Sequence, residues 1–393
     1  MNNNKIASTR FLPLTLAAAV AMVTAQHAAA EIVLYDQDET TFSTDGYINA
    51  FYVNSDVDRE GEQFDRRQSR VKMGFLPNWL GFTFGKEIDG LTLSGRSSFW
   101  VTINDSETNG TDTAIDVRQF YGTVSSPEWG EVLVGKDFGL FARSNILLDE
   151  LLAGYGQVSD TLGLVDFGGV SFGNIGSGYP YPFPTAQITY RSPKMGGLRV
   201  AAGIMDPYDS NQIDADGKAY QESPRFETEI TYEFEVAGAK IYSWINGAHQ
   251  TSDNTDSNVD SVTSQGLGYG VQAKMGGFSI TGSGFQAEGM NPFYTNNAGE
   301  ATLREVDSDG YLLQTSYTFG KNRVALSYGK TEDDGNGLGA AADYETRGIA
   351  YFRTINDNLK LVAEYNQYEI DAASGNGLGE DTDTIALGAV LNW

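Results

Sequence analysis

Apolar and polar residues alternate with a period of two along most of this chain, and this pattern constrains the fold more than any other feature. In the segment 224–235, Phe226, Ile230 and Phe234 fall on one face of an extended chain, whereas Glu227 and Glu229 fall on the other. Successive side chains of a β-strand point to opposite faces. Each such run therefore predicts a strand with one face toward an apolar medium.

The alternating runs predict about sixteen strands, most of them close to the ~9–11 residues that a tilted strand needs to cross a bilayer. The predicted strands are 43–54, 65–75, 90–104, 113–125, 130–137, 185–192, 197–206, 224–235, 238–250, 264–275, 276–287, 308–319, 320–331, 343–354, 357–370 and 381–393. The last of these ends flush with the aromatic residue Trp393.

The connections between the predicted strands are short and long in strict alternation from residue 125 onward. The short ones are 125–130, 193–197, 236–239, 275–277, 320–322 and 355–358; the longer, mostly acidic ones are 206–223, 251–264, 288–308, 332–343 and 371–382. Short turns at one end and long loops at the other are typical of an up-and-down membrane barrel. A soluble β-sandwich of this length would be expected to divide into two domains, but no linker is apparent. We therefore predict an all-β fold, a transmembrane antiparallel up-and-down β-barrel, over residues 31–393.

Residues 1–30 have the pattern of a secretory signal peptide. Lys5 and Arg10 precede an apolar run over 11–23, and Ala28-Ala29-Ala30 offers a cleavage site after Ala30. An N-terminal anchor helix is the alternative, but the run is shorter than the ~20 residues that span a bilayer. We expect an exported protein of the bacterial outer membrane, in which any membrane span is a strand.

Charge and composition exclude several classes of function. Cleavage would remove two of the 26 basic residues and none of the 52 acidic ones, so the mature chain would have a formal charge of −28. This balance excludes nucleic acid as a partner. The chain has no cysteine, and acidic fragments such as 307–310 lack the downstream glutamate of a calcium loop. We therefore predict no metal site and no cofactor.

The connection from 138 to 184 is the one exception to the pattern of ordinary loops. It is rich in glycine and far longer than most connections, so we expect it to be functional or disordered. Its apolar residues, which include Leu147, Leu151 and Val165, argue against disorder in water. We expect this third long loop to fold into the lumen and to pack against the inner wall.

Several short motifs precede this loop in order. They are Ala30-Glu31-Ile32, Asp45-Gly46-Tyr47, Ser69-Arg70-Val71-Lys72-Met73-Gly74-Phe75, Val117-Arg118-Gln119-Phe120-Tyr121-Gly122 and Trp129-Gly130-Glu131-Val132-Leu133-Val134-Gly135-Lys136-Asp137. Together with the terminal Trp393, the chain resembles the trimeric general diffusion porins of Gram-negative outer membranes, over essentially the whole mature sequence. The resemblance implies a homotrimer in contact with outer-membrane lipid and lipopolysaccharide. It also implies that Trp393 is an assembly signal for the barrel-assembly machinery.

In that family, carboxylates of the third loop face a cluster of basic residues on the opposite wall and narrow the pore. Carried over by matching position, the resemblance implies a basic wall that includes Arg70 and Arg118, with Lys136 just before the loop. Alternation adds Lys72 and Arg96 to this wall. The resemblance implies that the loop acids are among Asp149, Glu150, Asp160 and Asp166, although the loop lacks the family's usual Pro-Glu-Phe-Gly-Gly stretch.

These features predict a water-filled channel for passive diffusion of ions and small hydrophilic solutes, with a mild preference for cations. A substrate-specific channel for an anionic or sugar-type solute is the alternative, because Arg66, Arg70 and Arg96 could belong to a basic ladder. A barrel hydrolase is a distant alternative. It would depend on His249, the only mature histidine, near Ser252, and no nucleophile motif surrounds it. We therefore do not expect an enzyme.

Overall fold

The structure is a computed structural model that describes residues 31–61, 65–103, 115–166, 171–207, 221, 223–253, 261–298 and 303–393. The predicted signal peptide, residues 1–30, lies outside the described residues. Within these ranges the chain is nearly all β-strand, and none of the helices there is long and apolar enough to cross a membrane.

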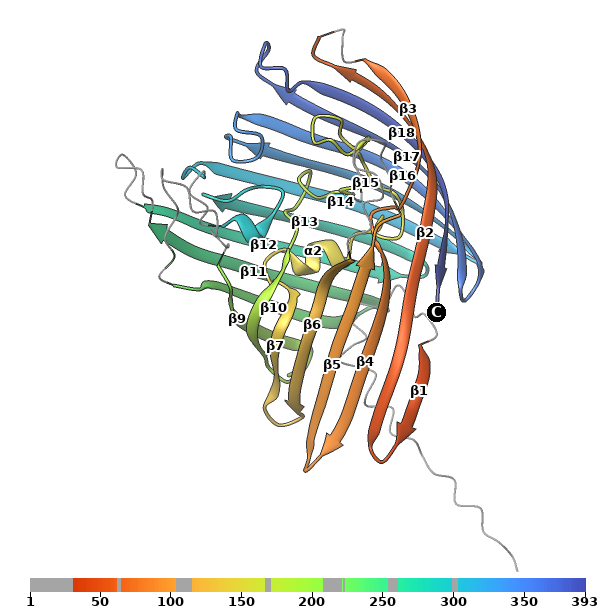
Figure 1. The fold of residues 1–393 in the computed structure, drawn as a ribbon, viewed down its shortest axis with the longest axis vertical. Helices are drawn as coiled ribbons and strands as arrows, with labels where there is room; N and C mark the ends of the chain where they lie inside the picture. Colours follow the sequence, from red (N-terminus) through yellow and green to blue (C-terminus); the bar gives the residue numbers. More distant parts are fainter. Residues whose placement is uncertain are drawn as a thin grey trace, which may run out of the picture.

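Neighbouring strands pair antiparallel and form a closed barrel of 16 spanning strands within the described ranges (Figure 1). The strands are β1 (Ile32–Gln37), β2 (Thr40–Arg59), β3 (Arg66–Lys72), β4 (Asn78–Ile88), β5 (Leu91–Val101), β6 (Ile115–Ser126), β7 (Gly130–Phe138), β8 (Pro184–Arg191), β9 (Leu198–Met205), β10 (Arg225–Val236), β11 (Ala239–Asp253), β12 (Ser261–Met275), β13 (Phe278–Glu288), β14 (Asp307–Phe319), β15 (Asn322–Asp333), β16 (Ala342–Asn356), β17 (Leu359–Ala372) and β18 (Glu380–Asn392). The predicted fold class is therefore confirmed.

β3 and β4 are two halves of one spanning strand, and β1, with 6 residues, is too short to span, so the 18 described strands make 16 spanning strands. Both pair with β2, β3 with its residues 51–57 and β4 with its residues 40–47. The break between them contains Pro77, which has no N–H to donate to a strand ladder. The predicted strand 65–75 ended at this break, so the prediction missed β4, and it also missed the short strand β1.

The barrel closes where its last strand meets its first. β18 pairs with residues 47–59 of β2, and β1 pairs with residues 40–44 of the same strand. Gly46 and Trp393 exchange two backbone hydrogen bonds, with N–O distances of 2.9 and 3.1 Å. A Cβ atom on Gly46 would lie only 2.1 Å from the indole of Trp393. The last side chain of the protein therefore packs directly on the backbone of the first spanning strand.

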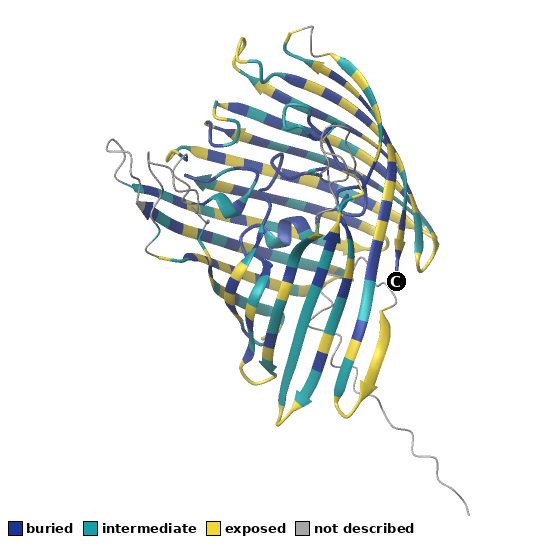
Figure 2. Cartoon of the chain, in the orientation of Figure 1, coloured by how far each residue is buried: buried dark blue, intermediate teal, exposed yellow. Residues whose placement is uncertain are grey.

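The two faces of the barrel wall differ as the alternation predicts. Along β18, Ile385, Leu387 and Leu391 point outward and are about half exposed, whereas Thr384 and Val390 point inward and are buried. Figure 2 shows the same alternation of exposed and buried residues along most strands. An outward apolar face of this kind suits the hydrocarbon core of a membrane.

The two ends of the barrel carry different connections. At one end are tight turns, such as Ala237–Gly238 between β10 and β11, where both residues have positive φ, at 50° and 81°. A type I′ hairpin turn requires this geometry, and glycine adopts it without strain. At the other end are longer connections, such as the one between β13 and β14, which contains the short helix η2 (Thr295–Asn297). This layout is typical of outer-membrane barrels, in which the short turns are periplasmic.

The described residues between β7 and β8, 139–166 and 171–183, lie inside the barrel (Figure 1). It contains the short helix α2 (Arg143–Leu147). Leu151, Tyr155 and Val158 of this loop pack in one buried cluster with Phe51 of β2 and Val390 of β18. Apolar contact of this kind removes surface from water, which explains why part of the inner wall is apolar.

Candidate functional site

Buried carboxylates of the barrel wall hold the loop in place. Glu227 of β10, Glu364 of β17 and Glu380 of β18 are each less than 5% exposed, and each accepts two hydrogen bonds from backbone N–H groups of the loop. The donors are Leu140 and Phe141, Tyr155 and Gly156, and Asp160 and Thr161, at 2.5–3.0 Å. Hydrogen bonds to a charged acceptor are stronger than neutral ones, so these contacts fix the course of the loop.

Two of the predicted loop acids, Asp149 and Glu150, point toward the wall formed by β14 and β15. Asp149 accepts hydrogen bonds from Gln314 at 2.7 Å and from Tyr179 at 2.6 Å, and Glu150 forms an ion pair with Arg323 at 2.9 Å. They are 0% and 2% exposed. Burial raises the pKa of the Asp149 carboxyl, and its hydrogen bonds oppose this effect. Both acids therefore anchor the loop instead of facing open water.

The other two loop acids, Asp160 and Asp166, contact basic residues of β3. Asp166 forms an ion pair with Arg66 at 2.7 Å, and its carbonyl oxygen accepts a hydrogen bond from Arg70 at 2.6 Å. Asp160 also pairs with Arg66. Lys72 is 1% exposed and donates to a carbonyl oxygen of the loop. The structure thus brings Arg70 and Lys72 to the loop, but in direct contact beneath it and not across an open gap.

The loop packs against the wall from β4 to β9 at some residues, such as Trp100 of β5 and Ala201 of β9, and leaves part of its inner face uncovered. A cavity of about 1250 Å³ lies between this wall and the loop. Its wall side chains include Trp79, Arg96, Trp100, Arg118, Tyr121, Arg191 and Arg199. The loop side chains that line it include Ile146, Leu147, Leu148, Leu152, Phe172 and Ile175. The cavity therefore has apolar side chains of the loop on one side, and its other side includes arginine and aromatic residues of the wall.

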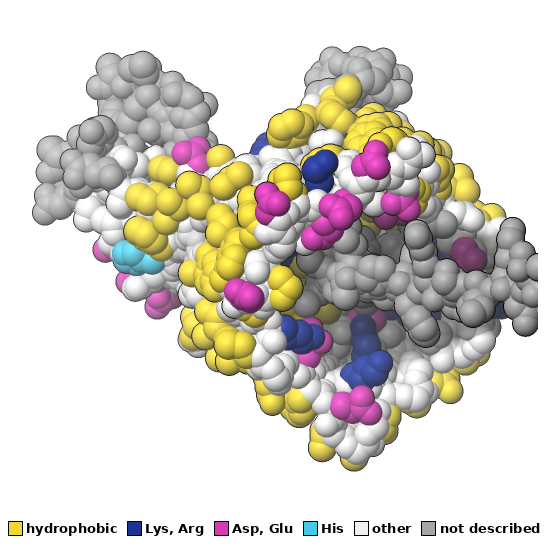
Figure 3. Space-filling model, turned by 90° about the horizontal axis from the view of Figure 1, so that it is seen from below, with side chains coloured by type: hydrophobic (Ala, Val, Ile, Leu, Met, Phe, Trp, Pro, Cys, Tyr) yellow, Lys and Arg dark blue, Asp and Glu magenta, His cyan; other side chains and the backbone are white. Residues whose placement is uncertain are grey.

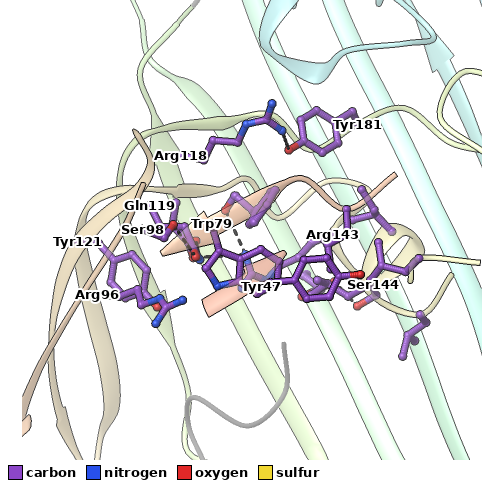
Figure 4. Close-up of a pocket in the computed structure, with 18 of the residues that line it drawn as sticks. Tyr47, Trp79, Arg96, Ser98, Arg118, Gln119, Tyr121, Arg143, Ser144 and Tyr181 are labelled. Carbon is purple, nitrogen blue, oxygen red and sulfur yellow. Dashed lines mark hydrogen bonds and ion pairs between the residues drawn. The ribbon is translucent and has the colours of Figure 1, made fainter. Parts of the chain in front are cut away.

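Arg96 and Arg118 line this cavity (Figure 4). Each forms an ion pair with an acid of the barrel wall. Arg96 Nη2 lies 3.0 Å from Asp45, and Arg118 Nε lies 2.6 Å from Asp116. Because each cation has a carboxylate beside it, this wall has polar groups of both signs and a small net charge.

Arg118 also lies among aromatic rings. Its guanidinium carbon is 4.7 Å from the ring centroid of Trp100, within the range of a cation–π contact. Its Nη1 donates to the hydroxyl of Tyr181 at 2.9 Å, and Trp79 stacks on Tyr47 nearby, with centroids 4.5 Å apart. Sequence reasoning did not single out these aromatic residues, although Trp100 has the same parity along β5 as Arg96.

Lys136 is not part of this wall, which corrects its expected position. Along β7, Leu133 and Asp137 line the cavity, whereas Lys136 has the parity of Val134, which is 52% exposed on the outer face. Its register partner on β6 is Phe120, which is 64% exposed. Alternation along β7 alone could have placed Lys136 outside.

The positions of His249 and Ser252 do not support the hydrolase alternative. His249 is exposed on β11, whereas Ser252 is 1% exposed and lies on the opposite face of that strand. In the part of the chain that the structure describes, there is no group of three or more His, Cys, Asp or Glu residues that could hold a metal ion.

Comparisons with known proteins agree with this architecture. A family model described as "Gram-negative porin" matches residues 17–373, whereas no curated protein matches the chain. The outer membrane channel DcaP of Acinetobacter baumannii aligns with a TM-score of 0.66 and 13% identity over 92% of this chain and 100% of that chain. The anion-selective porin from Comamonas acidovorans aligns with a TM-score of 0.63 and 13% identity over 90% and 100%.

The trimer form of in-vitro folded OmpT from Vibrio cholerae is a third similar structure, with a TM-score of 0.55 and 14% identity over 91% and 100%. At such low identity these structures show a shared fold. The family model covers most of the chain and indicates an outer-membrane diffusion channel. The chain belongs to the Gram-negative porins.

Proposed function

We propose that this porin passes ions and small hydrophilic solutes through the passage between the loop and the β4–β9 wall, with a mild preference for cations. The observation that carries this proposal is the charge balance of the passage. The described residues that line it include eight acids and eight bases: Glu31, Asp45, Asp116, Glu131, Asp137, Glu229, Glu233 and Glu235, and Arg96, Arg118, Arg143, Arg191, Lys194, Arg199, Lys240 and Lys274.

Because the acids and bases that line the passage are equal in number, the preference for cations over anions depends on charges elsewhere in the protein. The mature chain has a large excess of acids, and many of them are in the long connections of the sequence. Acids near a mouth attract cations over roughly a Debye length, ~8–10 Å in moderate salt. The preference should therefore be weak, and it should decline as salt is added.

A reversal potential across a tenfold KCl gradient tests this proposal. We expect a small potential with the sign of cation preference, and a smaller one when both solutions are made more concentrated. Replacing Arg96 and Arg118 by glutamine should increase the cation preference, because Asp45 and Asp116 would lose their partners. Firm anion selectivity of the wild type at low salt would contradict the proposal.

A substrate-specific channel is the second candidate, and the position of Arg118 favours it. A flat solute that carries an anionic group could contact this guanidinium while its apolar part lies between Trp100 and the loop. Benzoate should then interrupt the open-channel current at concentrations where acetate, with the same charge, does not. Trp100→Leu should abolish the difference. Equal effects of the two anions on the wild-type current would contradict the substrate-specific channel and favour the general diffusion channel.

We also propose that the channel is a homotrimer whose chain is exported with cleavage after Ala30 and inserted by the barrel-assembly machinery. In the membrane it would contact lipid and lipopolysaccharide. The apolar outer face and the resemblance of the sequence to trimeric porins support this assembly. Light scattering of an unheated detergent extract should give the mass of three mature chains, and the mass of one chain would refute the trimer.

A further inference from the structure

A second cavity, of about 540 Å³, lies at the end of the barrel that carries the short turns. We name it the basic bay. Its charged side chains are Lys240 of β11, Lys274 of β12, Lys321, Arg323 of β15, Lys360 of β17 and the loop acid Glu150. Figure 3 shows the molecule from below, where some Lys and Arg side chains lie close to Asp and Glu side chains. The described lining of the bay thus has five cations and one carboxylate.

Most of this positive charge has no partner among the described residues. Glu150 forms an ion pair with Arg323 at 2.9 Å and accepts a hydrogen bond from Ser316 at 2.9 Å. Lys240, Lys274 and Lys360 form no ion pair within 4.0 Å in the described ranges. One carboxylate therefore neutralises one guanidinium, and these three lysines still face the cavity.

The positions of two lysines make the excess of positive charge in the bay less favourable. Lys240 and Lys274 are direct register partners on neighbouring strands, and both line the bay. Like charges directly opposite each other destabilise a strand pair unless something offsets their repulsion. Both side chains are exposed, so a soluble counter-ion can reach them. The hydroxyls of Thr318 and Thr354 line the same cavity and can donate hydrogen bonds to an anion.

We propose that the basic bay binds multiply charged oxyanions of the phosphate type that arrive from the periplasmic end. A chain of phosphate groups can contact Lys240 and Lys274 on one side and Lys360 on the other at once, because it carries several anionic oxygens. The lysines line a cavity inside the barrel wall, away from lipid, so the ligand is a soluble anion and not a lipid headgroup. Lys240 and Lys274 also line the larger cavity, so the bay adjoins the proposed passage, whereas the proposed cation preference depends on acids outside the bay.

Calorimetric titration of the purified protein in detergent with tripolyphosphate tests the site. We expect the wild type to bind, and Lys274→Gln/Lys360→Gln to bind about tenfold more weakly, as for two partly exposed charge contacts. The matched control is Lys86→Gln/Lys330→Gln, which removes the same charge at positions that do not line the bay. It should bind as the wild type does.

Absence of binding by the wild type, or equal weakening in both double variants, would overturn the proposal. The single variant Lys240→Gln, which should also weaken binding, provides the same comparison if the double variant fails to fold. Conductance of each variant is measured in parallel. A channel that conducts normally but does not bind tripolyphosphate would refute the bay and leave the proposed channel intact.

Discussion

At the scale of single residues, a few buried carboxylates determine where the loop lies. Glu364 is 4% exposed and accepts hydrogen bonds from the backbone N–H groups of Tyr155 and Gly156, at 2.9 and 2.6 Å. Tyr155 and Gly156 are buried, so loss of the acceptor would leave their N–H groups desolvated without a hydrogen-bond partner. One side chain on the wall thus holds a turn that lies more than 200 residues earlier in the sequence.

We expect Glu364→Gln to loosen the loop without opening the barrel. The amide keeps one acceptor oxygen but places an NH2 group where the second acceptor is needed, which should cost about 1–3 kcal/mol locally. Open-channel current noise should rise, and the loop should become sensitive to protease. Glu369→Gln, a change on the exposed face of the same strand, is the control and should do neither. Equal noise in the two variants would show that Glu364 does not anchor the loop.

At the scale of elements, the alternation of the sequence predicted the strands and the faces of most of their residues. It missed β4 because the break at Pro77 interrupts the strand, and it missed β1 because Ile32, Val33 and Leu34 are consecutively apolar. It could not predict the course of the loop. The contacts of Glu150 with Arg323 and of Tyr155 with Glu364 join distant parts of the chain, and no local pattern specifies such pairs.

The seam of the barrel, where β18 pairs with β2 and closes the sheet, gives a prediction about assembly. Gly46→Ala should reduce the yield of folded barrel, because the added Cβ would overlap the indole of Trp393, and overpacking of this kind costs roughly 1–3 kcal/mol. Heat-modifiable mobility on gels measures this yield. Gly282→Ala is the control, since the nearest atom to its Cβ is 3.5 Å away.

A smaller terminal ring should relieve the overlap. Trp393→Phe in the Gly46→Ala background should recover part of the folded barrel, whereas deletion of Trp393 from the wild type should reduce it. Normal insertion of the deletion variant would refute the assembly role of Trp393. A Gly46→Ala variant that folds like the control would show that the seam tolerates the extra atom.

At the scale of the whole molecule, the loop divides the lumen into a covered and an open half. The covered half is the inner face of β14–β18, β2 and β3, where the loop acids and the apolar cluster lie. The open half is the wall from β4 to β9, where Arg96 and Arg118 lie beside aromatic rings. Permeation should therefore follow one side of the barrel, past a loop that presents apolar and not acidic side chains.

Cysteine accessibility tests this division most directly, because the natural chain has no cysteine. Ser94→Cys lies on the open wall, and Thr346→Cys lies on the covered wall, where the native side chain is 2% exposed. A bulky, charged methanethiosulfonate reagent should lower the single-channel conductance of the Ser94→Cys variant and leave that of the Thr346→Cys variant unchanged. The opposite result, with block only at position 346, would contradict the proposed path through the barrel.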